Sequence, residues 1–142
     1  MIDGVLITPL KVIQADHGDV WHAIKSSDLG YSGFGEAYFS SVKSGEIKGW
    51  KKHKEMTLNI VVPFGEIQFA MFDDRNKSLK TYQNVILSLA NYSRLTVPPN
   101  VWMAFKGLSM ETSVLLNIAS IPHDPLESEN KKLNEIDFEW RN

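Results

Sequence analysis

The stretch MTLNIVVPFGEIQFAMF, residues 56–72, contains two short runs in which every second side chain is apolar. The apolar positions on one face are Leu58, Ile60 and Val62 in the first run and Ile67, Phe69 and Met71 in the second. A period of two is typical of a β-strand that has one face on a hydrophobic core. Phe64-Gly65 lies between the runs and includes a residue that tight turns favour. The stretch therefore predicts two strands joined by a turn.

The same kind of pattern recurs on both sides of this stretch. Further strands are expected at residues 5–13, 35–42, 80–87, 93–97, 101–106 and 113–120. Turn signals lie between strands at residues 73–76, 98–100 and 106–107. Closely spaced short strands favour a sandwich or a barrel over βαβ units.

Few segments of the sequence favour a helix. One helix is expected at residues 19–26, and a turn or two of helix within residues 126–136. The latter segment is a polar tail that we expect to return to the barrel at Phe138 and Trp140. No repeat, low-complexity segment or linker interrupts the chain, so residues 1–142 are expected to form one all-β domain.

The overall composition narrows the classes of function. The 142 residues carry a formal net charge of −2, whereas nonspecific nucleic-acid binders are usually basic. The chain contains no cysteine, which excludes disulfides, thiolate catalysis and cysteine zinc sites. The sequence has neither a signal-peptide pattern nor an apolar run of about 18 residues. We therefore expect a soluble cytoplasmic protein that binds neither nucleic acid nor membrane.

One segment has the residue spacing of a known motif. Gly45 is followed by five residues and then by Lys51-Lys52-His53; four residues separate His53 from Leu58, and six separate Leu58 from Gly65. This spacing resembles the first cupin motif, in which two histidines and a glutamate bind a metal. Of these three ligand positions, only the one at His53 keeps a metal-binding side chain.

A second segment, residues 98–103, resembles the second cupin motif and has Met103 where that motif has a histidine ligand. Divalent metals in such barrels need several imidazole or carboxylate ligands that converge on one point. Lys51, Leu58 and Met103 do not supply them, so no metal and no other cofactor is expected. The two motifs together imply a cupin-type barrel, a double-stranded β-helix or jelly roll with little helix.

The chain is similar to metal-free cupins that act on nucleotide-linked keto sugars. Its resemblance to the dTDP-4-dehydrorhamnose 3,5-epimerases covers residues 45–51, 73–75 and 98–105, together with Trp140 near the end. It also resembles the dTDP-sugar 3,4-ketoisomerases, whose motif aligns without a gap on residues 48–74 and retains His53. The segment before Gly49 favours the epimerases and the segment after it favours the ketoisomerases. Both branches therefore stay open.

The resemblance implies catalytic roles for three residues. Lys51 stands where the epimerases have the histidine that takes a proton from carbon, and His53 lies two positions later. A histidine has an unperturbed pKa near ~6.5 and suits proton transfer at neutral pH. A lysine acts as a base only if burial or a neighbouring cation lowers its pKa. His123 lies near the position of the epimerases' tyrosine acid and is expected to replace it.

Substrate-binding roles are expected for Lys48, Glu36, Tyr38, Trp102 and Asn117. The resemblance implies that Lys48 meets the diphosphate, and it matches Glu36 and Tyr38 to a Gln-x-Asn pair. Trp102 follows two prolines and is expected to line the barrel mouth, where it stacks on a base or a sugar. Asn117 lies in an apolar run and needs a hydrogen-bond partner if it is buried, which suggests a polar group of the pocket.

Strand alternation separates the basic residues of the first motif. Lys51 and His53 are expected on the face that lines the barrel, and Lys48 and Lys52 on the opposite face. Lys48 is then not on the wall that carries the catalytic pair.

These features predict a nucleotide-sugar epimerase or ketoisomerase that moves a proton beside a ketone without a metal. The expected partner is a dTDP-4-keto-sugar, and pairing through exposed strand edges predicts a homodimer. The loss of several family residues leaves a second hypothesis open, a sugar-nucleotide-binding cupin with impaired catalysis that acts as a binding or regulatory module. A third is another small-molecule lyase or isomerase on the same barrel, because a fold does not fix a function.

Overall fold

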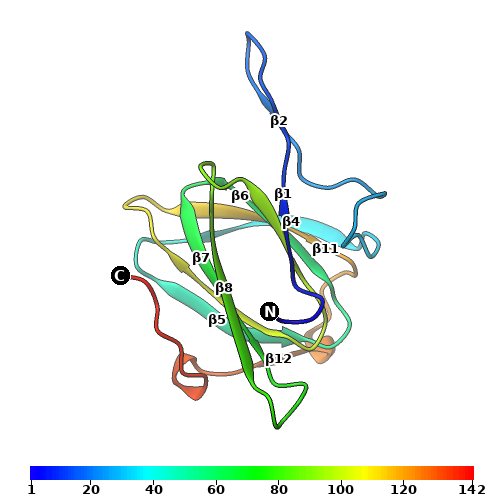
Figure 1. Cartoon of the computed structure of the whole chain (residues 1–142), viewed down its shortest axis with the longest axis vertical. Coiled ribbons are helices and arrows are strands. Elements are labelled where there is room, and N and C mark those ends of the chain that lie inside the picture. The colour runs from blue at the N-terminus through cyan, green and yellow to red at the C-terminus, as the bar shows by residue number, and fades with distance from the viewer.

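The computed structural model describes residues 1–142 and consists almost entirely of short strands (Figure 1). The strands are β1 (Leu6–Pro9), β2 (Val12–Ile13), β3 (Val20–Trp21), β4 (Glu36–Val42), β5 (Ile47–His53), β6 (Leu58–Phe64), β7 (Glu66–Asp73), β8 (Thr81–Ser88), β9 (Ser93–Val97), β10 (Trp102–Gly107), β11 (Ser113–Ala119) and β12 (Ser128–Asn130). Two 3-10 helices, η1 (Pro125–Glu127) and η2 (Leu133–Glu135), flank β12. No helix has the length and apolar character needed to cross a membrane. The expected all-β fold is confirmed.

The strands form two antiparallel five-stranded sheets that enclose a barrel (Figure 1). The first sheet has the order β1-β9-β6-β11-β4, and the second has the order β12-β5-β10-β7-β8. Strands β2 and β3 pair only with each other, as a hairpin arm that projects away from the barrel (Figure 1). The expected strand at residues 5–13 is therefore two strands, because β1 pairs with β9 while β2 leaves the sheet.

The main core lies between the two sheets. It contains all six apolar positions of the stretch 56–72 that were expected on one face, from Leu58 to Met71. Leu95 and Val97 of β9 and Leu115 of β11 complete it from the first sheet. Full burial of such a side chain contributes about 1.5–3 kcal/mol. The alternating pattern therefore identified the inward face of β6 and β7 correctly.

The turn between β6 and β7 depends on Gly65. This residue has a φ of 82°, in the left-handed region that favours glycine. A Cβ atom at this position would lie 2.3 Å from the hydroxyl oxygen of Ser113. That hydroxyl also accepts a hydrogen bond from the Glu66 amide at 3.1 Å. The tight turn and its contact with β11 leave no room for a side chain.

A second apolar cluster covers the outer face of the second sheet. Its buried members are Trp50, Ala70, Phe72, Trp102, Ala104 and Ile136. Phe138 and Trp140 pack against this cluster from the C-terminal tail, as expected from the sequence. The tail therefore lies across the sheet, and the residues 126–136 that precede it form η2, β12 and part of η1.

The helix expected at residues 19–26 is not present. Val20 and Trp21 form β3 and pair with Ile13 and Val12 of β2. The carboxylate of Asp19 accepts a hydrogen bond from the Ala15 amide at 3.2 Å and shapes the hairpin tip. Strand pairing within the arm takes the place of a helix whose only support was local sequence pattern.

Candidate functional site

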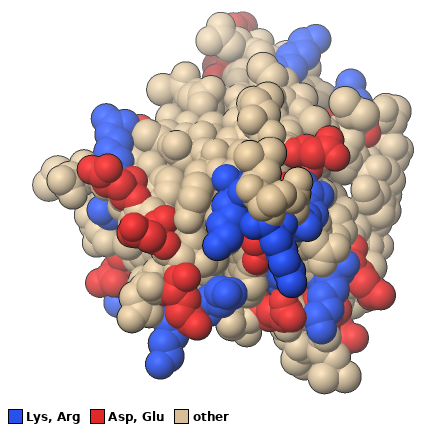
Figure 2. Space-filling model, turned by 60° about the horizontal axis from the view of Figure 1, so that its bottom comes forward, with Lys and Arg blue, Asp and Glu red and all other residues tan.

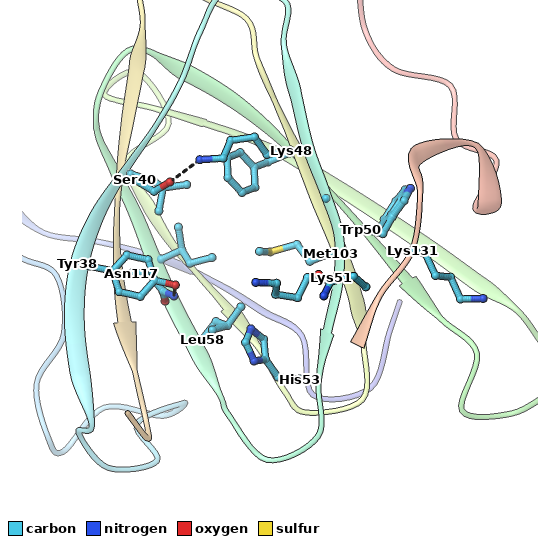
Figure 3. Close-up of a pocket in the computed structure, with 15 residues that line it drawn as sticks. Tyr38, Ser40, Lys48, Trp50, Lys51, His53, Leu58, Met103, Asn117 and Lys131 are labelled. Carbon is cyan, nitrogen blue, oxygen red and sulfur yellow. Dashed lines mark hydrogen bonds between the residues drawn. The ribbon is translucent and has the colours of Figure 1, made fainter. Parts of the chain in front are cut away.

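A cavity of about 310 Å³ opens inside the barrel, between the two sheets (Figure 3). One wall belongs to β5 and carries Lys48, Lys51 and His53. The facing wall belongs to β4 and β11 and carries Tyr38 and Asn117. Five apolar side chains make up much of the remaining surface: Leu58, Ile60, Met103, Phe105 and Leu115.

A β-bulge places Lys48 on the same wall as Lys51 and His53. Met103 of β10 pairs with Lys51, but Phe105, two residues later, pairs with Lys48, three residues earlier in β5. The extra residue in β5 reverses the alternation of its side chains. The expectation that Lys48 faces away from the catalytic pair is therefore wrong. Alternation predicts faces only where a strand is regular.

Gly49 lies within this bulge and permits it. Its φ is 142°, and its peptide bond to Trp50 is cis. A Cβ atom at Gly49 would lie 2.4 Å from the Cβ of Ala104 on the neighbouring strand. Only glycine lets β5 and β10 approach this closely, so Gly49 helps to set the direction of the cavity lysines.

The imidazole of His53 is oriented by a buried carboxylate. Its Nδ1 is hydrogen-bonded to Oε1 of Glu127, a residue of η1 that is only 5% exposed. The other carboxylate oxygen of Glu127 accepts hydrogen bonds from the amides of Glu55 at 3.1 Å and Met56 at 3.2 Å. This arrangement makes Nδ1 the proton-bearing nitrogen toward Glu127 and leaves Nε2 without a protein partner.

Glu127 is held as a carboxylate. Burial raises the pKa of this group, but hydrogen bonds from His53 and from the two backbone amides outweigh burial and lower its pKa below the ordinary value. A histidine paired with a carboxylate in this way is a common general base and acid.

The sequence did not identify Glu127 as a functional residue. Asp124 caps η1 by accepting a hydrogen bond from the Leu126 amide at 2.9 Å, and Pro125 opens the turn. These two residues mark a short helical turn that contains Glu127. Nothing local indicates that this turn packs against β5, because that contact joins residues 74 positions apart.

The cavity carries positive charge and no acidic side chain. The side chains of two lysines, Lys48 and Lys51, line it, and the lining includes no Asp or Glu. Lys131 borders the cavity as well, but its ammonium lies over the Trp102 ring on the outer face, 5.3 Å from the ring centroid. The Lys48 ammonium donates to the Ser40 hydroxyl at 3.0 Å and to the Ser41 carbonyl at 3.1 Å (Figure 3). Because the whole chain has a formal charge of −2, this concentration of lysines is a local feature that suits an anionic ligand.

The charges on the outer surface are more mixed. On the face shown in Figure 2, basic side chains gather toward the middle, with acidic side chains around them. Such a distribution adds a positive field at one region of the surface without making the molecule basic overall.

The four positions that hold a metal in other cupins all line this cavity. They are occupied by Lys51, His53, Leu58 and Met103. An ammonium repels a cation, a leucine has no donor atom, and one nitrogen of His53 is engaged by Glu127. The donor set does not fit a divalent metal, and no group of three or more His, Cys, Asp or Glu side chains elsewhere suits one.

Three of the expected site residues lie outside the cavity lining. Trp102 is buried on the outer face, where its Nε1 donates to Asp74 at 3.1 Å, so the expectation that it lines the barrel mouth is wrong. The reason is alternation, because Met103 next to it points inward. Glu36 begins β4 beyond the end of the cavity, and His123 is exposed in the connection that follows β11.

The barrel, its lysine-rich cavity and the carboxylate-oriented histidine define a cupin of the epimerase and isomerase type. The chain belongs to the family described as FdtA: WxcM-like, C-terminal, whose family model matches residues 4–133.

Individual relatives agree with this membership. A dTDP sugar isomerase from Desulfovibrio desulfuricans G20 is 33% identical, with a TM-score of 0.91 over 98% of this chain and 92% of that one. The sugar 3,4-ketoisomerase QdtA from Thermoanaerobacterium thermosaccharolyticum, solved in complex with TDP, shares the fold at 18% identity, with a TM-score of 0.76 over 91% of this chain and 89% of that one.

A curated relative comes from an archaeon. It is the "Probable low-salt glycan biosynthesis epimerase Agl13" of Haloferax volcanii, which is 25% identical over 103 residues. The match covers 68% of this chain and 64% of that protein, which is less than two thirds of its length.

Proposed function

We propose that this protein is a dTDP-4-keto-sugar isomerase that moves a proton beside the ketone without a metal. The observation that carries the proposal is His53, oriented by the buried Glu127, on the wall of a cavity that has lysines and no carboxylate. Membership of the FdtA family and the 33% identity to a dTDP sugar isomerase support the substrate class. The retained base and these relatives favour an enzyme over a binding module.

The proposed reaction starts with His53. Its free Nε2 takes the proton from the carbon next to the ketone, and the electrons of the C–H bond form a carbon–carbon double bond. The ketone oxygen then takes a proton from the Lys51 ammonium. Lys51 lines the same wall as His53, and in this proposal it serves as the acid and as the cation that stabilises the developing oxyanion.

The second half of the reaction decides the branch. In a 3,4-ketoisomerase, the neighbouring hydroxyl returns its proton to Lys51 as the new ketone forms, and His53 protonates the former ketone carbon. Both groups act from the β5 wall, so the proton stays on one face of the sugar. Because His123 lies outside the cavity, we favour this branch. Epimerisation instead needs a proton donor on the cavity wall opposite β5, where Tyr38 has a phenolic hydroxyl.

The remaining cavity residues are assigned to binding. We assign Lys48 to the diphosphate, because its ammonium is the other cation that the cavity holds beside Lys51. Tyr38 and Asn117 are assigned to the sugar, on the wall that faces Lys51 (Figure 3). Glu36 and Trp102 are not included in this assignment.

A proton NMR assay in deuterated water with dTDP-4-keto-6-deoxyglucose tests the proposal. Wild type should replace a ring proton beside the ketone with deuterium and rearrange the sugar. His53→Asn should lose the exchange by at least about 100-fold, the lower range for removal of a general base. His123→Asn removes an exposed histidine outside the cavity and serves as the matched control, which should retain wild-type exchange. Exchange that survives in His53→Asn would remove His53 from the reaction.

We also propose that residues 1–142 form a single domain and that the protein acts as a homodimer in the cytoplasm. The arm exposes four apolar side chains, Val12, Ile13, Val20 and Trp21. An isolated two-stranded hairpin is at best marginally stable in water, so the arm needs a surface to cover it. A second copy of the chain is the partner that is always present. The absence of cysteine agrees with a reducing compartment.

A further inference from the structure

Three buried side-chain atoms have no hydrogen-bond partner: Nε1 of Trp50, Nε of Arg94 and Oδ1 of Asn117. A buried polar group without a partner costs about 1–3 kcal/mol of stability. Such a group in a native protein needs a structural explanation or a partner that arrives with a ligand. The surrounding structure accounts for the burial of two of these residues and not for that of the third.

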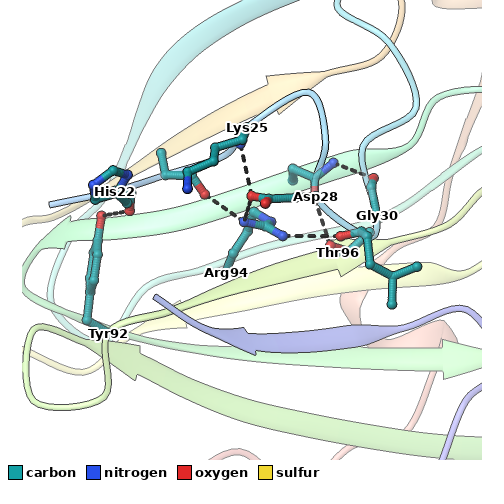
Figure 4. A network of polar contacts seen from close by, with 10 residues as sticks. His22, Lys25, Asp28, Gly30, Tyr92, Arg94 and Thr96 are labelled. Carbon is teal, nitrogen blue, oxygen red and sulfur yellow. Dashed lines mark hydrogen bonds and ion pairs between the residues drawn. The ribbon is translucent and has the colours of Figure 1, made fainter. Parts of the chain in front are cut away.

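Arg94 has a structural explanation, because its guanidinium is already engaged (Figure 4). It donates to the carbonyl of Ala23 at 2.8 Å and the carbonyl of Leu29 at 3.2 Å, and it contacts the Asp28 carboxylate at 3.3 Å. These contacts fasten the loop at residues 22–30 to β9. Trp50 packs in the outer cluster against Phe138 and Trp140, which accounts for its burial.

Asn117 has no comparable explanation. Its side chain lines the cavity and is only 3% exposed, and Oδ1 accepts no hydrogen bond. The other half of the amide is fixed, because Nδ2 donates to the Tyr38 hydroxyl at 2.8 Å. The inward positions of β11 on either side are Leu115 and Ala119, so an apolar residue would fit the core pattern. A polar residue is kept here at a cost in stability.

The position of Asn117 in the cavity indicates what its oxygen meets. In Figure 3, Asn117 lies between Lys48 and Ser40 at one end and His53 at the other, across from Lys51. Phosphate oxygens belong at the lysine end and the reacting carbons beside His53. Both a phosphate and a ketone present only acceptor oxygens, which an amide oxygen repels. A sugar hydroxyl, which donates, is the group that fits.

We infer that Oδ1 of Asn117 accepts a hydrogen bond from a ring hydroxyl of the sugar and makes Asn117 a specificity-determining residue. The inference rests on the proposed function for the class of ligand. Because Oδ1 itself is buried, the contact requires a turn of the terminal amide toward the cavity, and Tyr38, whose hydroxyl holds Nδ2, is 43% exposed and borders the same cavity. A sugar without a donor at that place leaves the oxygen unpaired and binds more weakly.

Titration calorimetry with dTDP-glucose and with dTDP tests the inference without any turnover. Wild type should bind dTDP-glucose more tightly than dTDP. Asn117→Leu should reduce this preference by about 3- to 10-fold, the equivalent of one hydrogen bond, while its affinity for dTDP stays unchanged. Asn117→Asp keeps an oxygen at the same place and should retain most of the preference.

Thermal unfolding of the same variants separates binding from structure. Because Asn117→Leu removes an unpaired buried acceptor, its Tm should equal or exceed that of wild type, whereas a purely structural asparagine would lower it. A wild type without preference for dTDP-glucose, a leucine variant that keeps the preference, or a clear fall in Tm would overturn the inference. Failure of the deuterium-exchange assay would instead remove the proposed reaction and leave this binding test valid.

Discussion

The pairing of His53 with Glu127 holds the imidazole by a hydrogen bond to a buried carboxylate. Removal of the carboxylate should leave the imidazole free to rotate and to carry its proton on the wrong nitrogen. We expect Glu127→Gln to lower kcat by about 10- to 100-fold, as loss of an orienting partner does at related sites. The matched control is Glu129→Gln, which alters an exposed glutamate paired only with Lys52 and should keep wild-type kcat. An unchanged kcat in Glu127→Gln would remove its orienting role.

The same carboxylate makes stability depend on pH. Its pKa is lowered in the folded state, because the hydrogen bonds from His53 and two amides outweigh the effect of burial. The stability that it contributes is therefore complete above its ordinary value of 4.5 and is lost as the pH falls through the lower folded value. We expect the free energy of urea unfolding to fall less steeply with decreasing pH in Glu127→Gln than in wild type. If the free energy of unfolding fell equally in both proteins, the carboxylate would contribute nothing to stability.

Single residues were predictable where they lie in a spaced motif. Lys51 and His53 follow from the distances between Gly45, Leu58 and Gly65, which reflect strand and turn lengths within one stretch of chain. Glu127 does not follow from any such spacing, because its role arises from a packing contact between distant segments. Trp102 was assigned to the mouth on its neighbouring prolines alone, without the strand register that turns it outward.

The strands themselves were predictable because each has a regular alternation over a buried face. β6 and β7 are examples, since every apolar position expected to face inward does so. The bulge in β5 was not predictable, because it depends on how β5 pairs with β10 and not on β5 alone. The direction of Lys48 could not be derived without that pairing. Tertiary pairing likewise explains why residues 19–26 form part of a hairpin arm instead of a helix.

Substitutions at two glycines separate the cost of backbone strain from the cost of a steric contact with a neighbouring strand. Gly65 and Gly45 have similar positive φ values, 82° and 76°, but a Cβ at Gly45 would meet nothing within 4 Å. Gly45→Ala should therefore cost only the backbone term of about 1–2 kcal/mol. Gly65→Ala should cost more, by about 1–3 kcal/mol, because the new Cβ meets Ser113. Urea unfolding measures both, and equal losses would show that the contact with β11 is unimportant.

On the scale of the whole molecule, the hairpin arm of β2 and β3 projects away from the barrel (Figure 1) and leaves its apolar side chains exposed. If a second copy covers the arm, Val20→Lys should weaken the dimer in size-exclusion chromatography with light scattering. The matched control is Leu79→Lys, which changes a 67% exposed apolar residue in the loop between β7 and β8. The control should behave as wild type. A wild type that elutes as a monomer at high concentration would refute the dimer.

The location of Glu127 has a consequence for shortened forms of the protein. The carboxylate lies C-terminal to every strand from β1 to β11, and the buried members of the core between the sheets all precede residue 120. A chain cut after β11 would therefore keep the residues of that core and His53, but it would lose the partner of the imidazole. The segment that orients the histidine is thus separable in the sequence from the strands that bury the core.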